Sequence, residues 1–412
     1  MPSETSVMHS NRDHQNAGTL LGLPRMKGLL LCGGMLGVAG LVAWGSGFAV
    51  LLATQICVLW CFGLSYQLLF GRTGMLSFGH AVNFGLAAFA TTHAVRWLGG
   101  PGGWPIYEIL PLFGALAGML CGLVLGYPVT RRSGVAFAMV TLGLGELVAA
   151  CFLMFPGFFG GEAGITLQRT TVASALGLDY GRSANQLVLT SCWSLLVVGV
   201  ILWLAQTPFG LAIVAVRENP QRIEYLGYRT ASVRWASYLV ASTLAGIAGS
   251  LSALTYEIVT VDSVSLHTSA NVLLMTVIGG AQSVLGPLVG AVFLTVMQSV
   301  VSDWTRAWLF YYGFVFVIVV LEAPDGIMGL FGRPRGERST RSSMTRASGY
   351  GLFAVLLVVF VETCYQLTLG EPTQLPGWQD LKPPELKAIL LCSGALVAAA
   401  IVLWLRSREV QQ

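Results

Sequence analysis

Long apolar runs, separated by short polar stretches, follow one another along most of the chain. A helix needs about 20 mostly apolar residues to cross the hydrocarbon core of a bilayer. Runs that meet or approach this length cover residues 28–45, 48–70, 75–95, 106–126, 134–155, 187–205, 237–256, 271–301, 308–323, 349–369 and 388–405. The pattern predicts an all-α fold, a polytopic bundle of membrane helices.

Composition supports this prediction and excludes an ordinary soluble domain. The 412 residues are 55% hydrophobic and only 10% charged, whereas soluble domains carry roughly 25% charged residues. So few charges do not cover a water-facing surface, and we expect lipid to cover much of the chain. The eight cysteines lie in or beside apolar runs without metal-ligand spacing, so we expect no metal site.

Arginine and lysine residues set the expected orientation, because cytoplasmic loops of membrane proteins are enriched in them. Most of the 23 basic residues fall on one side when both termini are placed in the cytoplasm. The exceptions are Arg96, Arg169, Arg182, Arg306, Lys382 and Lys387. Residues 257–270 are then external and the basic stretch 333–346 internal, so 271–301 must count as two passes or half-passes.

Polar and basic stretches also suggest the domain boundaries. Residues 1–24 form a polar tail, 25–331 the main transmembrane domain, 332–348 a basic cytoplasmic linker, and 349–412 an extra pair of transmembrane helices with a short tail. Within the main domain, glycines recur every four residues at 114, 118, 122 and 126, and small residues at 241, 245, 249 and 253. This spacing favours close packing of helix backbones.

Two polar, glycine-rich stretches interrupt apolar runs: "GRTGMLSFGHAVNFG" (71–85) and "GGAQSVLGP" (279–287). Irregular backbone at membrane depth is tolerated where protein or a water-filled cavity satisfies it, and broken segments point to a substrate path. The alternative is that both are ordinary turns. The candidate path residues at the breaks are Ser77, His80, Asn83, Gly279, Gly280, Gln282, Ser283, Gly286 and Pro287.

Glu146 lies near the middle of the run 134–155, where an ionisable side chain is costly unless it faces the bundle interior or a cavity. Glu146 and Thr141 are therefore candidate lining residues of a translocation path. The alternative for Glu146 is an interhelical hydrogen bond, from Thr141 or from a neighbouring span. His80 and Asn83, three residues apart, share a helix face, and their alternative is likewise a helix–helix contact. We expect Glu162, Glu257 and Asp262 to be solvated outside.

Motifs for catalysis and nucleotide binding are absent from the sequence. A P-loop needs glycine directly before its lysine, but Lys27, Lys382 and Lys387 follow Met, Leu and Leu. No HExxH or GxSxG motif occurs, and the histidines at 80, 93 and 267 are isolated. We therefore expect a non-enzyme that binds neither ATP, another cofactor nor nucleic acid.

The segment "AVRENPQRIEYLGY" (215–228) is polar and lies between two apolar runs. Asn219 before Pro220 predicts a helix start, and Gly227 predicts its end. The helix is barely two turns and needs a packing partner, with Ile223 and Leu226 as its expected apolar edge. It either lies against the chain's own spans or docks into another subunit.

At this point the order of motifs resembles a known family. Residues of roughly 50–331 resemble the LivM-type permease subunit of branched-chain amino acid ABC importers. The stretches that carry the resemblance are "GRTGMLSFGHAVNFGLAAF", "GVAFAMVTLGLGEL", "GGEAGI", "TPFGLAIVAVRENPQRIEYLGY", "LAGIAGSL", "VIGGAQSVLGPLVGAVF" and "APDGIMGLF".

The resemblance implies about ten core transmembrane helices and a multi-pass protein of the bacterial inner membrane. It implies three kinds of partner besides membrane lipid: a LivH-type second permease subunit, a pair of cytoplasmic ATPase subunits that bind ATP, and a periplasmic solute-binding protein. It also implies that 215–228 couples this chain to the ATPases. The coupling residues it implies are Arg217, Glu218, Asn219, Pro220, Arg222, Leu226 and Gly227.

The sequence departs from the family pattern at two places. The family usually has glycine where this chain has Gln282, and the two extra spans within 349–405 have no counterpart. The family also includes subunits that resemble urea and amide permeases, so the expected cargo is a branched-chain amino acid or a related small polar solute. The alternative functions are a self-sufficient secondary transporter or channel in which Glu146 carries a proton, and a membrane-embedded enzyme or assembly protein.

Overall fold

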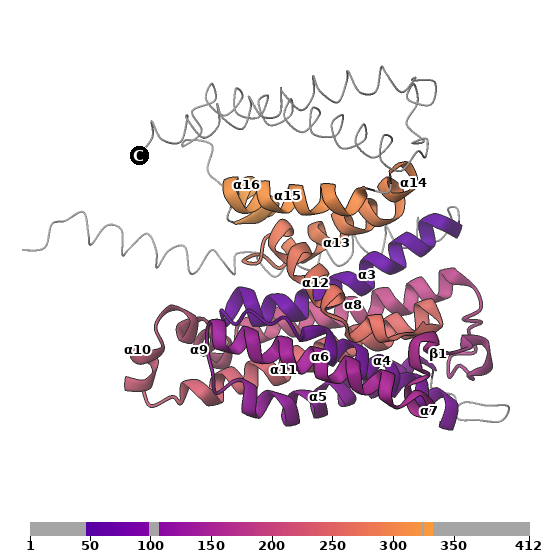
Figure 1. The fold of residues 1–412 in the computed structure, drawn as a ribbon, viewed down its shortest axis with the longest axis horizontal. Coiled ribbons are helices and arrows are strands. Elements are labelled where there is room, and N and C mark those ends of the chain that lie inside the picture. The colour runs from indigo at the N-terminus through magenta and orange to yellow at the C-terminus, as the bar shows by residue number, and fades with distance from the viewer. Residues whose placement is uncertain (1–46, 99–106, 306, 324, 333–412) are drawn as a thin grey trace, which may run out of the picture. The chain divides into compact units, whose positions relative to one another are not determined.

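The computed structural model describes residues 47–98, 107–305, 307–323 and 325–332 (Figure 1). The predicted spans 28–45, 349–369 and 388–405 lie outside these residues, as do the polar tail and most of the basic linker. Within them the fold is helical apart from turns and one pair of two-residue strands.

Each predicted apolar run from residue 48 to residue 323 contains a helix. The longer helices are α3 (Gly47–Gln67), α4 (His80–Leu98), α5 (Leu110–Val129), α6 (Val135–Met154), α8 (Ser183–Ala205), α9 (Pro208–Glu218), α11 (Thr230–Tyr256), α12 (Leu266–Gly279), α13 (Gly286–Val296) and α15 (Trp308–Glu322). The shorter ones are α7 (Pro156–Phe159), α10 (Pro220–Tyr225), α14 (Ser302–Trp304) and α16 (Gly326–Gly332). The prediction for 75–95 was too early by five residues, because α4 begins only at His80.

Six helical segments of the described residues are long and apolar enough to cross a membrane. They are Gly47–Arg72, Tyr107–Val129, Val135–Met154, Ser183–Ala205, Thr230–Tyr256 and Trp308–Gly329. The interrupted run is two shorter apolar helices, Leu266–Gly279 and Gly286–Val301. At 1.5 Å per residue α12 is about 21 Å long, less than the hydrocarbon core, which agrees with the predicted interruption.

The described residues fall into two compact units, 47–292 with 325–328, and 293–323 with 329–332. In the first unit α11 is the central helix: it packs against α3, α4 and α5, and α8 packs against α3. Buried apolar side chains fill the space between these helices, among them Leu64, Ala88 and Leu251. In the second unit Phe293 stacks on Tyr312 of α15, with ring centroids 6.1 Å apart.

The glycine stripe of α5 lies directly against the backbone of α11, which confirms the predicted close packing. A Cβ atom at Gly118 would overlap the carbonyl oxygen of Ser242, and one at Gly114 would lie 2.5 Å from the carbonyl oxygen of Gly246. The α11 face in contact is therefore Ser242 and Gly246. The predicted small stripe of α11 faces another neighbour, since Gly249 lies against the backbone of Phe84 on α4.

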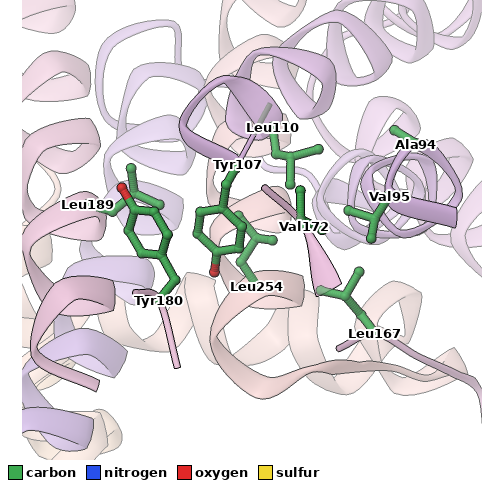
Figure 2. Close-up of a cluster of buried hydrophobic side chains, with 9 residues drawn as sticks. All are labelled: Ala94, Val95, Tyr107, Leu110, Leu167, Val172, Tyr180, Leu189 and Leu254. Atoms are coloured by element: carbon green, nitrogen blue, oxygen red, sulfur yellow. The ribbon is translucent and has the colours of Figure 1, made fainter. Parts of the chain in front are cut away.

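A two-stranded antiparallel ribbon lies at one end of the first unit. Strand β1 (Ile165–Thr166) pairs with β2 (Ile258–Val259), in the register Ile165 opposite Val259. A cluster of buried hydrophobic residues at this end includes Tyr107 and Tyr180. The rings of these two tyrosines stack with centroids 4.1 Å apart (Figure 2). The ribbon is a small departure from the predicted all-α fold.

Candidate functional site

The polar segment after α9 folds as its capping residues predict. The side chain of Asn219 accepts a hydrogen bond from the backbone N–H of Arg222 at 3.1 Å, which caps α10 (Pro220–Tyr225). At the other end Gly227 has a φ of +89° and its N–H donates to the carbonyl of Glu224 at 2.9 Å. Thus both ends of this short helix are satisfied locally.

The predicted apolar edge of this helix is correct for Ile223 and wrong for Leu226. Ile223 is buried in its own chain, with 3% of its surface exposed, whereas Leu226 is 71% exposed. The reason is that α10 ends at Tyr225, so Leu226 already belongs to the turn that Gly227 completes. Ile223 packs against the chain's own residues, as the first alternative has it, while Tyr225 and Leu226 are 90% and 71% exposed.

A shallow, open depression adjoins this exposed pair. It is lined by Glu224, Gly227, Tyr228, Arg229, Thr230 and Ala231. Two of these lining residues join α10 to α11, because the hydroxyl of Thr230 at the start of α11 donates to Glu224 Oε1 at 2.7 Å. The other predicted coupling residues Glu218 and Arg222 are exposed on the same segment, and Pro220 is partly exposed.

Arg217, at the end of α9, contacts both predicted breaks. Its Nη1 donates to the backbone carbonyl of Gly71 and, at 3.2 Å, to the side-chain oxygen of Gln282. The two breaks also touch directly, since a Cβ atom at Gly71 would overlap the carbonyl oxygen of Ala281. Sequence reasoning assigned these residues to two separate groups and missed that they meet.

The second break is a compact turn, residues 280–285, between α12 and α13. Gly279 lies against the backbone of Gly286, and Gly290 against that of Met275, so the two helices leave no room for Cβ atoms where they meet. The N–H of Gly286 donates to the carbonyl of Ser283 at 2.9 Å, and Gly280 adopts a φ of +115°. Pro287 of the predicted path packs against Gly63 of α3.

The first break is non-helical from Thr73 to Gly79, and other helices satisfy its backbone. Thr141 on α6 accepts a hydrogen bond from the N–H of Phe78 at 3.2 Å, and Tyr66 donates to the carbonyl of Ser77 at 3.1 Å. Ser269 on α12 accepts from the N–H of Ala81 at 3.0 Å. Non-helical backbone within a membrane needs hydrogen-bond partners from the protein or from water, and here side chains of neighbouring helices supply them.

A buried polar cluster follows the first break, and it contains the predicted residues Ser77, His80 and Asn83. His80 Nε2 lies 2.9 Å from the hydroxyl oxygen of Ser65, and the amide of Asn83 donates to the hydroxyl of Tyr238 at 3.1 Å. These are helix–helix contacts, as the alternative interpretation had it. However, His80 Nδ1, Asn83 Oδ1, Ser77 Oγ and the side-chain amide of Gln67 have no hydrogen-bond partner in the part of the chain that the structure describes.

Glu146 lies on a different surface from this cluster. Thr141 is buried, and its hydroxyl donates to the carbonyl of Ala138 at 2.9 Å. Glu146 is exposed on α6, together with Gly143 and Leu147. The predicted path residues therefore occupy three places in the first unit: the first break with its buried cluster and Thr141, the stretch 279–287, and the exposed face of α6.

At the end of the first unit that carries the β ribbon, a carboxylate orders the loop 172–181. Glu108 accepts hydrogen bonds from Ser174 Oγ at 2.6 Å, from the N–H of Ala175 at 3.0 Å and from the hydroxyl of Tyr180 at 3.2 Å. Burial, together with the charge of Glu108, raises the pKa of Tyr180 to about 12, so its hydroxyl keeps the proton that it donates. Sequence reasoning missed Glu108, because its partners lie more than 60 positions away.

Glu257 was expected to be solvated and instead forms an ion pair. Its Oε1 lies 2.8 Å from Nε of Arg169, with 37% of the Glu257 side chain exposed. Glu257 ends α11 in a left-handed conformation, at a φ of +57°. The pair thus connects the end of α11 with the loop that follows β1.

Comparisons with known proteins identify the family of the chain. The family model described as branched-chain amino acid transport system / permease component matches residues 48–323. The high-affinity branched-chain amino acid transport system permease protein LivM of Escherichia coli K12 is 29% identical, over 70% of this chain and 72% of its own length. A probable branched-chain amino acid transport permease protein, LivH, of Methanocaldococcus jannaschii is 26% identical, over 54% of this chain and 73% of its own length.

A more distant relative is the autoinducer 2 import system permease protein LsrC of Photorhabdus laumondii, 26% identical over 50% of this chain and 71% of its own length. No solved structure matches the chain. The matched region 48–323 holds both breaks, Glu146 and the polar segment after α9. The chain is thus a multi-pass membrane protein that belongs to the permease component family of branched-chain amino acid transport systems.

Proposed function

We propose that this chain is the permease subunit of an ABC importer in the bacterial inner membrane, carrying branched-chain amino acids or related small polar solutes inward. ATP is bound and hydrolysed by two cytoplasmic partner subunits, which dock on α10 and the turn that follows it, residues 220–229. Family membership and the apolar spans support the transport role. The single observation that carries the coupling role is the capped helix α10, which presents Tyr225 and Leu226 to solvent.

An exposed aromatic at the end of a capped helix and an exposed leucine in the turn that follows are suited to docking. Covering each side chain contributes about 1.5–3 kcal/mol, and aromatic anchors are common at the centres of interfaces. Arg222 and Arg229 flank the pair, and arginine-rich loops face the cytoplasm. The depression beside Tyr228 offers a partner side chain a place between α10 and the start of α11.

The opposite end of the first unit is the side on which a periplasmic solute-binding protein would dock. There the loop 172–181 is held by Glu108, and the ion pair between Arg169 and Glu257 joins the segment after β1 to the end of α11. A surface ordered in this way loses little conformational entropy when a partner binds.

Glu146 on the exposed face of α6 supports a second permease subunit as neighbour. A charged side chain facing lipid near the bilayer centre costs about 3 kcal/mol or more. A partner subunit that covers this face, with a hydrated path between the two chains, removes that cost. Gly143, with no atom within 4 Å of a Cβ built on it, leaves room for a close approach. Glu146 then lines the solute path.

The proposal is tested by reconstituting the full chain in proteoliposomes with its partner permease, both ATPase subunits and the binding protein. Solute uptake should require ATP, and Tyr225→Ala with Leu226→Ala should abolish capture of the ATPase subunits. Leu176→Ala is a matched control, because Leu176 is also 71% exposed but lies in the loop at the opposite end. Uptake by the lone chain, driven by a pH gradient without ATPases, would overturn the proposal.

A further inference from the structure

The side chain of Arg217 is the point where three segments far apart in the sequence meet. Its guanidinium donates to the Gly71 carbonyl, 146 positions away, and to Gln282, 65 positions away. Gly71 belongs to the π-helical turn Leu68–Arg72, which continues α3. Gln282 belongs to the turn between α12 and α13. All three residues lie in the first compact unit.

The chemistry of this contact suits an arginine. The last carbonyl groups of a helix lack intrahelical donors, and a cation near them interacts favourably with the helix dipole. The planar guanidinium carries five N–H donors in a fixed arrangement, so one side chain can serve a backbone carbonyl and an amide oxygen together. A lysine ammonium is a point charge on a flexible stem and fixes two acceptors less well.

The apolar stem of Arg217, a residue exposed to solvent, packs against the backbone of Gly74. A Cβ atom at Gly74, which has a φ of +74°, would lie 3.0 Å from Cγ of Arg217. A Cβ atom at Gly71 would overlap the carbonyl oxygen of Ala281, so the two breaks touch beside the guanidinium. The side chain therefore packs along its apolar stem as well as at its charged end.

The backbone connects this contact to α10 within two residues. Arg217 occupies the last turn of α9, which ends at Glu218, and Asn219 caps α10. A displacement of α10 therefore reaches the Arg217 backbone with little slack. From there the guanidinium reaches the π-helical turn that follows α3 and the 280–285 turn.

We infer that Arg217 is a positioning residue that transmits movement of α10 to both membrane breaks, with Gln282 as the acceptor that sets its orientation. The inference rests on the proposed function, in which ATPase subunits move α10. It assigns Arg217 a role inside this subunit and not in binding the ATPases. Two acceptors on separate segments make one side chain sufficient to move both breaks together.

The test uses the reconstituted complex and measures ATPase capture, solute-stimulated ATP hydrolysis and solute uptake in parallel. Arg217→Lys should leave ATPase capture intact and lower solute-stimulated hydrolysis by roughly tenfold, and Gln282→Ala should lower it by roughly threefold, within the usual range of coupling energies. Gln282→Glu, which keeps an acceptor at the same position, should retain coupling. Arg132→Lys, at an exposed arginine between α5 and α6, is the matched control and should change nothing.

The double variant identifies the interaction itself. If Arg217 and Gln282 act through one contact, Arg217→Lys with Gln282→Ala should be no worse than Arg217→Lys alone, because the contact is already lost. Additive losses, or loss of ATPase capture in Arg217→Lys, would overturn the inference. Gln282 is exposed, so its two variants decide the matter if Arg217→Lys does not fold. A wild-type complex without ATP-dependent uptake would instead reject the proposed function.

Discussion

The N–H of Phe78 donates a hydrogen bond to Thr141 Oγ1 at 3.2 Å, which joins the non-helical segment 73–79 to α6. Thr141→Val keeps the shape of the side chain and removes the acceptor. A buried N–H left without a partner costs about 1–3 kcal/mol, so we expect the free energy of unfolding in mixed micelles to fall by about that amount. Thr141→Ser keeps the hydroxyl and should lose less; equal losses for Val and Ser would contradict the assigned hydrogen bond.

The second prediction concerns Gly118, where the backbones of α5 and α11 are in close contact. A Cβ atom there would overlap the Ser242 carbonyl oxygen, so Gly118→Ala forces the helices apart and should cost about 1–3 kcal/mol of unfolding free energy. Gly199 on α8 is the control, because no atom lies within 4 Å of its ideal Cβ position. Gly199→Ala should be neutral or stabilising by up to about 1 kcal/mol, and the same denaturant titration measures both.

The contrast between these helices and the coupling segment shows what local sequence can predict. Asn219, Pro220 and Gly227 define α10 through interactions within a few residues, so its start and end follow from the sequence. The exposure of Leu226 did not follow, because the helix ends one residue earlier than its apolar spacing suggests. The direction of the Leu226 side chain depends on whether the helix ends before or after this residue.

Contacts between distant segments could not be predicted in the same way. The breaks at 73–79 and 280–285 were expected from glycine and polar residues in apolar runs, and both are present. Their meeting at Arg217 depends on the tertiary packing of α3, α9 and α12, for which hydrophobic pattern gives no pairing rule. Glu108 is a further example, because a carboxylate beside an apolar run reads as solvated until its partner loop is placed.

The Asn219 cap allows a test of whether coupling to ATP hydrolysis depends on the local order of α10. Asn219→Ala removes the acceptor for the Arg222 N–H and should destabilise this helix by about 1 kcal/mol. Because α10 is only six residues long, we expect faster amide hydrogen exchange across 220–226 and weaker solute-stimulated ATP hydrolysis in the reconstituted complex. Asn219→Asp keeps a capping oxygen and should preserve both; unchanged exchange in Asn219→Ala would show that the cap is not what orders the helix.

Glu146 gives the prediction that bears most directly on the solute path. If its carboxylate lines a hydrated path between two permease subunits, Glu146→Gln removes the charge while the size and polarity of the side chain stay nearly the same. We expect uptake to fall by roughly tenfold at neutral pH, since a carboxylate that pairs with a cationic group contributes about 1.5–3 kcal/mol through charge-assisted hydrogen bonding. Glu146→Leu should lower uptake further, because it removes the polar group altogether.

A matched control separates this role of Glu146 from a general effect of removing a carboxylate. Glu162→Gln, at an exposed carboxylate in the loop after α7, removes a charge outside α6 and should leave uptake unchanged. Uptake by Glu146→Gln equal to that of wild type at every pH would mean that the charge of Glu146 has no part in transport, and α6 would then contribute only a packing surface to the neighbouring subunit.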